Sequence, residues 1–309
     1  LRAFRSASTM NPSLIQGIIP PLVTPFAAEG HIDEQAHRAE VRYMIESARI
    51  HGLAVGGSTG EGHTLSVAET RQLSAWTLEE AKGRVPVITG IIADSTRAAV
   101  ERAKAVADLG VAALQVTPVH YVFRPDDDSM LRFFETVATE SGLPVIIYNV
   151  VPQSYLLPPL LVRILKDVPG VIGVKQSASD MKALADLLLL IREAGIENRV
   201  RILSAVDALL YSSFQLGSHG AVAAILTAVP EWCVELWDAV QAGDHARALR
   251  LHTNLLRLWN AIDAPNLPAN VRAVMELRGR PGGAPRSPMP SSSPVQVERI
   301  RHVLRCAEA

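Results

Sequence analysis

Short apolar runs alternate with longer amphipathic segments along most of the chain, a pattern typical of repeated strand and helix units. Most of the short runs lack a strict alternation of apolar and polar residues, as expected for parallel strands that are buried on both faces. Eight strands are predicted, at Ile18–Val23, Leu53–Val55, Val85–Thr89, Ala112–Val116, Val145–Tyr148, Val171–Val174, Val200–Leu203 and Gly220–Ala224.

The segments between these strands carry signals for the ends of helices. Ser66 and Glu69 have the spacing of a capping box, in which each side chain bonds to the backbone N–H of the other residue. Further signals are Asp33 at the start of the first helix, Asp94 or Ser95 at the start of the third, Ser179 at the start of the sixth, and Gly110 and Gly195 at helix ends.

Eight strands, each followed by a helix, predict the α/β class and a closed (β/α)8 TIM barrel with a C-terminal helical appendage. An open doubly wound sheet is the alternative. It is disfavoured because no glycine-rich loop of the dinucleotide-binding or P-loop type follows any of the strands.

The alternation stops after Pro230, and the rest of the chain has helical periodicity. We therefore expect the barrel over residues 11–229 and a helical region packed on it over residues 230–309. Its helices are predicted at Glu231–Gln241, His245–Trp259, Asn270–Leu277 and Val295–Cys306, with Gly279–Pro294 as an ordered connection or a flexible linker. Residues 1–10 are expected to be an N-terminal extension or an expression remnant, in preference to a clipped transit peptide.

Composition removes several classes of partner and scaffold. The 309 residues hold 30 Lys and Arg against 31 Asp and Glu, so the net charge of −1 gives no field that would attract nucleic acid or anionic lipid. No apolar run approaches the roughly 20 residues needed to span a bilayer. Cys233 and Cys306 have no second cysteine at ligand spacing, which disfavours disulfide scaffolds and zinc ribbons and indicates a reducing, cytoplasmic location.

Lys175 comes directly after Val171–Val174, at the end of a strand where barrel enzymes place their active sites. A buried ammonium is costly, and burial favours the neutral amine, which attacks carbonyls and forms a Schiff base. The alternative, a lysine in a salt bridge at the barrel rim, is equally compatible with this position alone.

Two other strand ends carry groups that suit the same chemistry. For Tyr148 alone the simpler interpretation is a core ring with its hydroxyl in water, but beside a Schiff-base lysine it would transfer protons. After the second strand, Gly57 permits close backbone approach, and Ser58 and Thr59 offer hydroxyls and amides that can hold a carboxylate. Taken alone this loop is an ordinary turn, in which Glu61 is expected to cap or orient the chain. Together the three features predict a site for a small 2-oxo acid.

Four segments also carry a resemblance to the dihydrodipicolinate synthase/N-acetylneuraminate lyase family, namely Gly17–Phe26, Gly57–Glu61, Tyr148–Val150 and Gly173–Lys175. The resemblance implies that Lys175 forms the Schiff base, that Tyr148 is the general acid/base, and that Ser58 and Thr59 bind the carboxylate of pyruvate and relay protons. It also implies a relay completed across a subunit interface by Tyr121, or alternatively His120. A homotetramer built as a dimer of dimers is implied, and no metal or organic cofactor.

Two departures from the family pattern bear on the substrate. True dihydrodipicolinate synthases carry an arginine after the Tyr-Asn-Val-Pro motif, where it binds the carboxylate of aspartate semialdehyde, whereas Val151–Leu157 contains no arginine. The segments that bind a sugar chain in neuraminate lyases, after the seventh and eighth strands, are mostly apolar here. The predicted substrate contacts are Gly57, Ser58, Thr59, Val222, Gln153 and Ser204, with Asp207, Gln176 and Ser177 as further polar candidates.

The sequence therefore predicts a pyruvate-dependent class I aldolase or lyase that makes or breaks a C–C bond and is not a true dihydrodipicolinate synthase. A dehydratase of a deoxy-2-oxo sugar acid that uses the same lysine is an alternative. A non-catalytic 2-oxo acid binding protein is a third hypothesis, which the presence of both Lys175 and Tyr148 disfavours.

Overall fold

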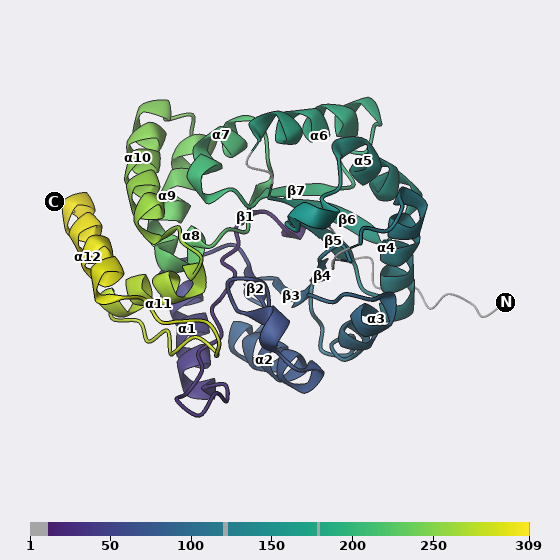
Figure 1. Ribbon diagram of the computed structural model, residues 1–309. Coiled ribbons are helices and arrows are strands. Elements are labelled where there is room, and N and C mark those ends of the chain that lie inside the picture. The colour runs from purple at the N-terminus through teal and green to yellow at the C-terminus, as the bar shows by residue number, and fades with distance from the viewer. Residues whose placement is uncertain (1–11, 120–122, 178–179, 309) are drawn as a thin grey trace.

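Eight parallel strands form a single curved sheet, with β1 hydrogen-bonded to β8 and the remaining strands following in sequence order (Figure 1). The computed structural model describes residues 12–119, 123–177 and 180–308. The strands are β1 (Gly17–Ile18), β2 (Leu53–Val55), β3 (Val87–Ile91), β4 (Ala113–Val116), β5 (Val145–Asn149), β6 (Val171–Gln176), β7 (Arg201–Ser204) and β8 (Gly220–Ala221). A parallel bridge between Pro21 and Ala54 closes the barrel between β1 and β2, so the predicted (β/α)8 fold is confirmed.

In the described ranges, helices surround this sheet in the order expected of a barrel, and four more follow it (Figure 1). The surrounding helices are α1 (Glu34–Glu46), α2 (Val67–Ala81), α3 (Thr96–Lys104), α4 (Asp127–Ser141), α5 (Pro158–Asp167), α6 (Met181–Glu193), α7 (Leu210–Gln215) and α8 (Ile225–Ala228). The C-terminal helices are α9 (Pro230–Gln241), α10 (His245–Ile262), α11 (Leu267–Leu277) and α12 (Pro294–Glu308).

The first and last strands are shorter than predicted, for two different reasons. Pro20 and Pro21 have no N–H to donate to a neighbouring strand, so the predicted Ile18–Val23 strand is wrong beyond Ile18. The chain then continues alongside β2 through single hydrogen bonds, such as that from Leu22 N to Ala54 O at 2.8 Å. At the other end, the predicted Gly220–Ala224 strand is wrong beyond Ala221, where β8 ends, and Ala224 already has the helical backbone angles that lead into α8.

Side chains cap the helices at three predicted positions. Asp33 accepts a hydrogen bond from a backbone N–H in the first turn of α1, and Ser66 and Glu69 form the complete capping box of α2. For α3 the capping residue is Ser95, not Asp94. These local bonds satisfy N–H groups that the first turn of a helix leaves without partners.

Two helix boundaries differ from the prediction. Asp180 caps α6, whereas the predicted Ser179 lies outside the described residues. Gly195, at φ +65°, follows α6 as predicted. Gly110 does not end α3, because that helix stops at Lys104 and a series of turns precedes the glycine.

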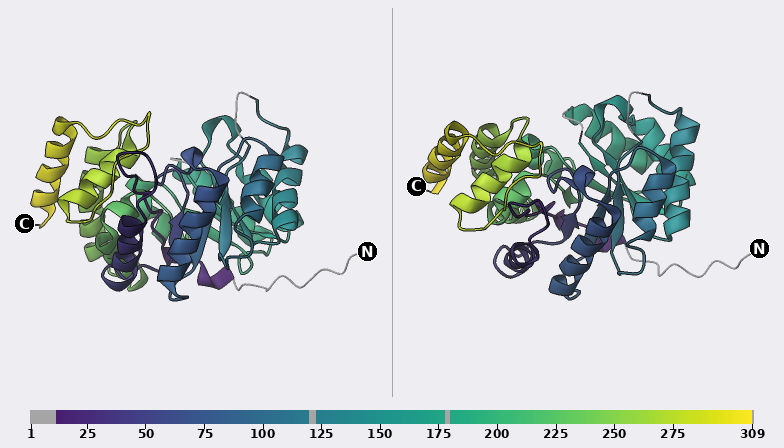
Figure 2. Two further views of the ribbon diagram at one scale, coloured as in Figure 1. Left: turned by 90° about the horizontal axis from the view of Figure 1, so that it is seen from below. Right: turned by 60° about the horizontal axis from the view of Figure 1, so that its bottom comes forward.

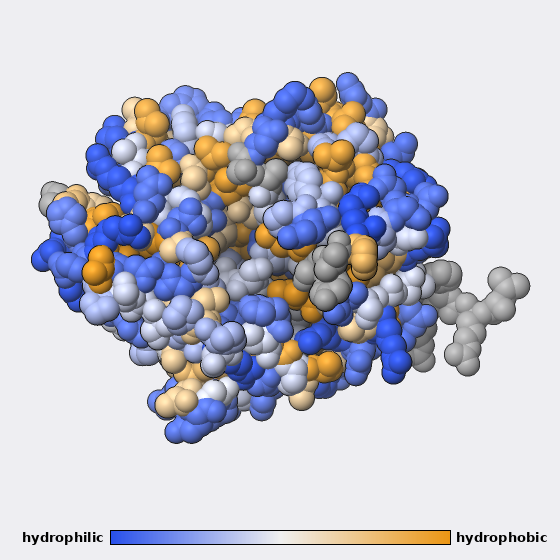
Figure 3. All heavy atoms as spheres, in the orientation of Figure 1, coloured by the Kyte–Doolittle hydropathy of each residue, from blue (hydrophilic) through white to orange (hydrophobic). Residues whose placement is uncertain are grey.

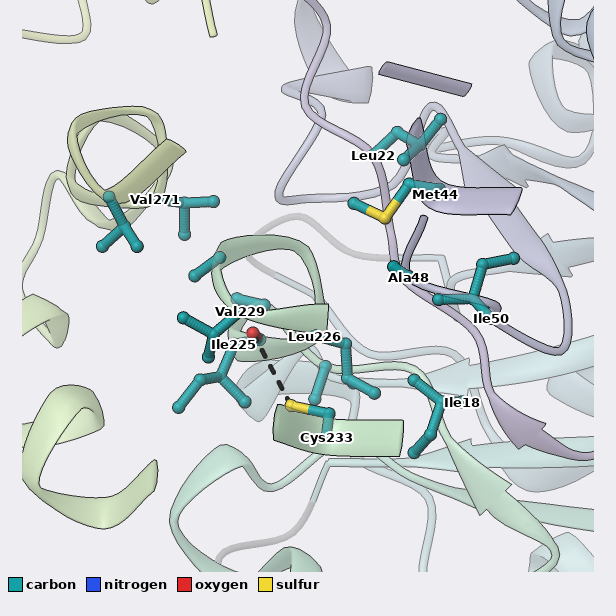
Figure 4. Close-up of a cluster of buried hydrophobic side chains, with 14 of the residues drawn as sticks. Ile18, Leu22, Met44, Ala48, Ile50, Ile225, Leu226, Val229, Cys233 and Val271 are labelled. Atoms are coloured by element: carbon teal, nitrogen blue, oxygen red, sulfur yellow. Dashed lines mark hydrogen bonds between the residues drawn. The ribbon is translucent and has the colours of Figure 1, made fainter. Parts of the chain in front are cut away.

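Three apolar clusters form the core. The barrel interior holds one of them, composed of Ile15, Ile19, Ala54, Ile88, Ala113, Ile146, Ile172, Leu203 and Val222. The other two lie between the sheet and its helices. Figure 4 shows part of one, a cluster that joins Ile18, Leu22 and Met44 to Ile225, Cys233 and Val271. Because Val271 belongs to α11, the C-terminal helices share a core with the barrel.

The C-terminal helices stand on one side of the barrel (Figure 2). Helix α9 packs on β1 and α7, α10 packs on α9 and α12, and α11 packs on α8. The face shown in Figure 3 is mostly hydrophilic, with apolar residues scattered in small groups. Among the described helices, none combines the length and the apolar character needed to cross a bilayer.

Candidate active site

The neighbouring strands β5 and β6 bring a phenol and an amine together in the barrel. Tyr148 and Lys175 are paired in register on these strands, and each residue is only 4% exposed. Lys175 Nζ lies 3.7 Å from the centroid of the Tyr148 ring. Both residues lie inside their strands, because β5 and β6 extend further than the apolar runs that predicted them.

The surroundings of Lys175 bear on the two interpretations of this lysine. Within the ranges that the structure describes, no carboxylate forms an ion pair with its amine, and the face of the Tyr148 ring is its cation–π partner. The interpretation of Lys175 as a salt-bridged lysine at the barrel rim therefore finds no partner carboxylate among the described residues. Since a buried ammonium that no carboxylate contacts directly is costly, the geometry favours a chemical role over a structural one.

The loop after β2 reaches the same place. Its turn is closed by hydrogen bonds from Gly62 N to Gly57 O at 2.9 Å and from Glu61 N to Ser58 O at 3.0 Å. The Tyr148 hydroxyl donates to Ser58 Oγ at 3.0 Å. This hydrogen bond joins the loop to the tyrosine, whose ring lies against the Lys175 amine.

A cavity of about 280 Å³ opens between these groups. Ser58, Thr59, Tyr148 and Lys175 line it, and the rest of the lining is mostly apolar: Val150, Ser177, Ala205, Asp207, Val222, Ala223, Ala224, Leu267 and Pro268. An apolar cavity with a few convergent polar groups is typical of a small-molecule site. Among the described residues, no group of three or more His, Cys, Asp or Glu side chains is arranged to hold a metal ion.

Among the described lining residues, Asp207 contributes the one carboxyl group. It lies in the short 3-10 turn Asp207–Leu209 that follows β7. Burial raises the pKa of this carboxyl to about 6, although a hydrogen bond from Ile225 N, at 2.7 Å, and the charge of Lys175 both oppose the rise. Asp207 is therefore mostly ionised above neutral pH and presents a negative charge to the cavity.

The predicted substrate contacts divide into two groups. Ser58, Thr59 and Val222 line the cavity, as do Ser177 and Asp207. The structure does not bring Gly57, Gln153 or Ser204 into the lining; these three assignments are not supported by the geometry.

The three residues outside the lining lie or make their contacts away from the cavity. The Gly57 carbonyl closes its own loop, and Gln153 is exposed on the short turn Pro152–Ser154. The Ser204 hydroxyl donates to Ser213 Oγ at 2.9 Å.

Gln176, a further polar candidate, accepts a hydrogen bond from Asn149 at 3.0 Å, within the wall of the barrel. His120 and Tyr121, predicted to complete the proton relay, lie outside the described residues.

The first turn of α11 also lines the cavity, and the sequence did not indicate this. Leu267 and Pro268 contribute to the wall, although they belong to the region that was expected only to pack on the barrel. The Pro-Asn-Leu-Pro run at residues 265–268 marks a helix start and carries no chemical signal of its own.

Comparisons with known proteins agree on one family. Residues 14–306 match the dihydrodipicolinate synthetase family. The 4-hydroxy-tetrahydrodipicolinate synthase of Bradyrhizobium diazoefficiens is 34% identical over 285 residues, which cover 91% of this chain and 93% of that protein.

Solved structures give the same result. A putative dihydrodipicolinate synthetase from Pseudomonas aeruginosa superposes with a TM-score of 0.88 at 30% identity, over 95% of this chain and 99% of that one. YagE, a prophage protein of the dihydrodipicolinic acid synthase family from E. coli K12 in complex with pyruvate, superposes with a TM-score of 0.89 at 26% identity. That match covers 96% of this chain and 99% of the YagE chain.

Proposed function

The chain belongs to the dihydrodipicolinate synthetase family and is a class I, pyruvate-dependent lyase, and on this premise we propose that Lys175 forms the Schiff base. The observation that carries the proposal is the buried amine, 3.7 Å from the Tyr148 ring. Among the described residues this amine has no ion-pair partner.

In the proposed mechanism, Lys175 Nζ bonds to the ketone carbon of the 2-oxo acid. The carbonyl oxygen takes up protons and leaves as water, so that an iminium remains. Tyr148 transfers these protons, and its hydrogen bond to Ser58 Oγ, at 3.0 Å, connects it to the loop. Ser58 and Thr59 hold the carboxylate of the substrate. The iminium then accepts the electron pair of the C–C bond that breaks, or supplies that pair as an enamine when the bond forms.

For the second substrate we propose an aldehyde without a carboxylate. Lys175 is the one cation among the described lining residues, and it is engaged by the 2-oxo acid. No arginine follows Tyr148 in the segment where true dihydrodipicolinate synthases carry one. Asp207 adds a negative charge that would repel a second carboxylate, and the apolar lining favours an aldehyde with few hydroxyl groups.

Borohydride trapping tests the role of Lys175. Incubation with pyruvate and borohydride should attach one reduced pyruvate to the peptide that contains Lys175, and Lys175→Ala should abolish the adduct. Lys182→Ala, at an exposed lysine paired with Asp186, is the control and should trap like the wild type. An adduct on the Lys175→Ala variant, or none on the wild type, would refute the assignment.

Product analysis tests the substrate. We expect pyruvate release from 4-hydroxy-2-oxo acids whose remaining chain is uncharged and apolar, and slower release from analogues with a second carboxylate. Asp207→Asn should narrow that difference because it removes the repelling charge. Equal or faster turnover of the dicarboxylates by the wild type would overturn the proposal that the second substrate is an aldehyde without a carboxylate. Loss of water without pyruvate release would identify the alternative, a dehydratase of a deoxy-2-oxo sugar acid.

We also propose that the enzyme is a homotetramer whose relay is completed by Tyr121 from a neighbouring subunit. Sedimentation should show a tetramer, and Tyr121→Phe should reduce kcat while leaving the assembly intact. A fully active monomer, or a Tyr121→Phe variant with unchanged kcat, would contradict this arrangement. His120→Ala measured in parallel distinguishes the two candidates for the relay.

A further inference from the structure

Glu61, two residues after Thr59, forms a buried ionic junction with the C-terminal region. Glu61 is fully buried, and Arg272 of α11 is 2% exposed. Arg272 Nη2 lies 2.6 Å from Glu61 Oε1. The second carboxylate oxygen accepts a hydrogen bond from the backbone N–H of Arg286, at 3.0 Å. Both oxygens of this carboxylate are thus held by residues that follow the barrel in the sequence.

The backbone around Glu61 leaves the loop little freedom. Glu61 itself has φ 54° and ψ 36°, in the left-handed region that residues with side chains rarely adopt. A Cβ at Gly62 would lie 1.8 Å from Gly56 O, and one at Gly60 would lie 2.6 Å from Leu22 O. Glycine or asparagine would suit the backbone at position 61 better than glutamate. The energetic cost of this backbone conformation must therefore be offset by the contacts of the Glu61 carboxylate.

Arg272 connects this loop to three other segments. It donates hydrogen bonds to the carbonyls of Thr24 at 2.7 Å, Pro268 at 3.1 Å and Gly282 at 3.1 Å. Thr24 Oγ1 in turn donates to the Gly60 carbonyl, at 2.7 Å, inside the loop. Since Pro268 lines the cavity, a single guanidinium contacts both the loop that carries Ser58 and Thr59 and the part of the cavity wall that α11 provides.

We propose that Glu61 and Arg272 are positioning residues for the reaction. Their ion pair holds Ser58 and Thr59 in place against Tyr148, and it makes α11 a part of the active site. This inference rests on the proposed Schiff-base function, and it assigns to the C-terminal region a role beyond packing. Neither side chain lines the cavity, so both act through the loop and not on the substrate.

The chain contains a matched control pair. Arg280, from the same C-terminal region, lies 2.7 Å from Glu40 of α1, and both side chains are 5% exposed. Burial lowers the pKa of Arg272 and of Arg280 alike, and in both cases the paired carboxylate opposes this effect. Within the described residues, Arg280 and Glu40 form no hydrogen bond or ion pair with the loop. Loss of either pair should therefore cost similar stability, whereas only the Glu61–Arg272 pair contacts the loop that carries Ser58 and Thr59.

The experiment compares Glu61→Gln and Arg272→Lys with Glu40→Gln and Arg280→Lys. Urea unfolding reports stability, and borohydride trapping and steady-state kinetics report KM for pyruvate and kcat. Misplacement of a binding group by about 1 Å can cost on the order of 100-fold in rate. We expect Glu61→Gln to raise KM for pyruvate and slow trapping by at least about 10-fold, with a smaller effect for Arg272→Lys, which keeps the charge. The control pair should lose stability but change trapping by less than about 2-fold.

Three outcomes would overturn the inference. One is unchanged KM and trapping in Glu61→Gln, and another is an equal loss of trapping in the control variants at equal stability. If Glu61→Gln does not fold, Arg272→Lys becomes the decisive variant. Wild-type kinetics in Arg272→Lys would then be the third outcome that overturns the inference. Trapping by the wild type is measured first. If it fails, the Schiff-base function itself is wrong, which is distinguishable from a failure of the positioning role.

Discussion

Replacement of Asp207 by asparagine should change how the stability of this enzyme depends on pH. Burial raises the pKa of this carboxyl from its ordinary 3.8 to about 6. Each pKa unit corresponds to about 1.36 kcal/mol, so a rise of this size corresponds to about 3 kcal/mol. The asparagine side chain keeps an oxygen that can accept the hydrogen bond from Ile225 N, at 2.7 Å in the wild type, but it does not ionise.

The sign of the effect follows from the two states of the carboxyl. The folded protein retains the proton up to about pH 6, whereas the unfolded chain releases it near pH 3.8. Between these values the folded state binds more protons, so the contribution of Asp207 to stability falls as pH rises, and it is fully lost above about pH 6. The stability of Asp207→Asn relative to the wild type should therefore rise by about 3 kcal/mol from about pH 3 to about pH 8.

Urea unfolding followed by tryptophan fluorescence measures this gain at a fixed protein concentration. Any constant cost of asparagine, such as a weaker bond to Ile225, cancels because only the change with pH is compared. Asp94→Asn, at an exposed aspartate, is the control and should show a much smaller change with pH. A difference between Asp207→Asn and the wild type that stays constant over the whole range would refute the argument from burial.

Further predictions concern the proton transfer by Tyr148, the ion pair between Glu69 and Arg286, and the two cysteine thiols. Tyr148→Phe should lower kcat by about 100-fold or more in steady-state assays while the protein stays folded by circular dichroism, because a proton donor is lost. The side chain of Arg286 lowers the pKa of Glu69 to about 2. Glu69→Gln should therefore destabilise the protein by about 2 kcal/mol near neutral pH, and by progressively less as pH falls from about 4.5 toward 2 in acid titrations of stability. Of the two thiols, exposed Cys306 should react with a thiol reagent in the native state and buried Cys233 only after unfolding, because burial raises its pKa.

Each of these predictions can fail on its own measurement. An undiminished kcat in Tyr148→Phe would remove the phenol from the relay. A pH-independent loss in Glu69→Gln would show that packing, not charge, matters there. Rapid labelling of both thiols in the folded protein would contradict the burial of Cys233.

Much of the site could be predicted from local patterns. Apolar runs buried on both faces indicated eight parallel strands, and consecutive strands of a barrel are neighbours. Tyr148 and Lys175 stand on consecutive strands, so their proximity followed from the order of the strands. The capping residue Ser66 was equally predictable, because its partner lies three positions away.

Other features were less accessible to sequence patterns. The β1 and β8 strands proved short because Pro20 and Pro21 interrupt pairing and because the chain turns into α8 within three residues of Ala221. The pKa of Asp207 depends on how completely its neighbours exclude water, which no spacing along the chain reports.

The sequence by itself thus determined the barrel and predicted its reactive strand ends and an orienting role for Glu61, since these depend on residue type and short-range periodicity. The tertiary structure alone decided that α11 turns back onto the cavity and that Arg272 supplies the partner of Glu61. The physical reason is that tertiary packing brings the two members of a buried ion pair together. Its two members can lie far apart in the sequence, and neither one carries a local pattern that identifies the other.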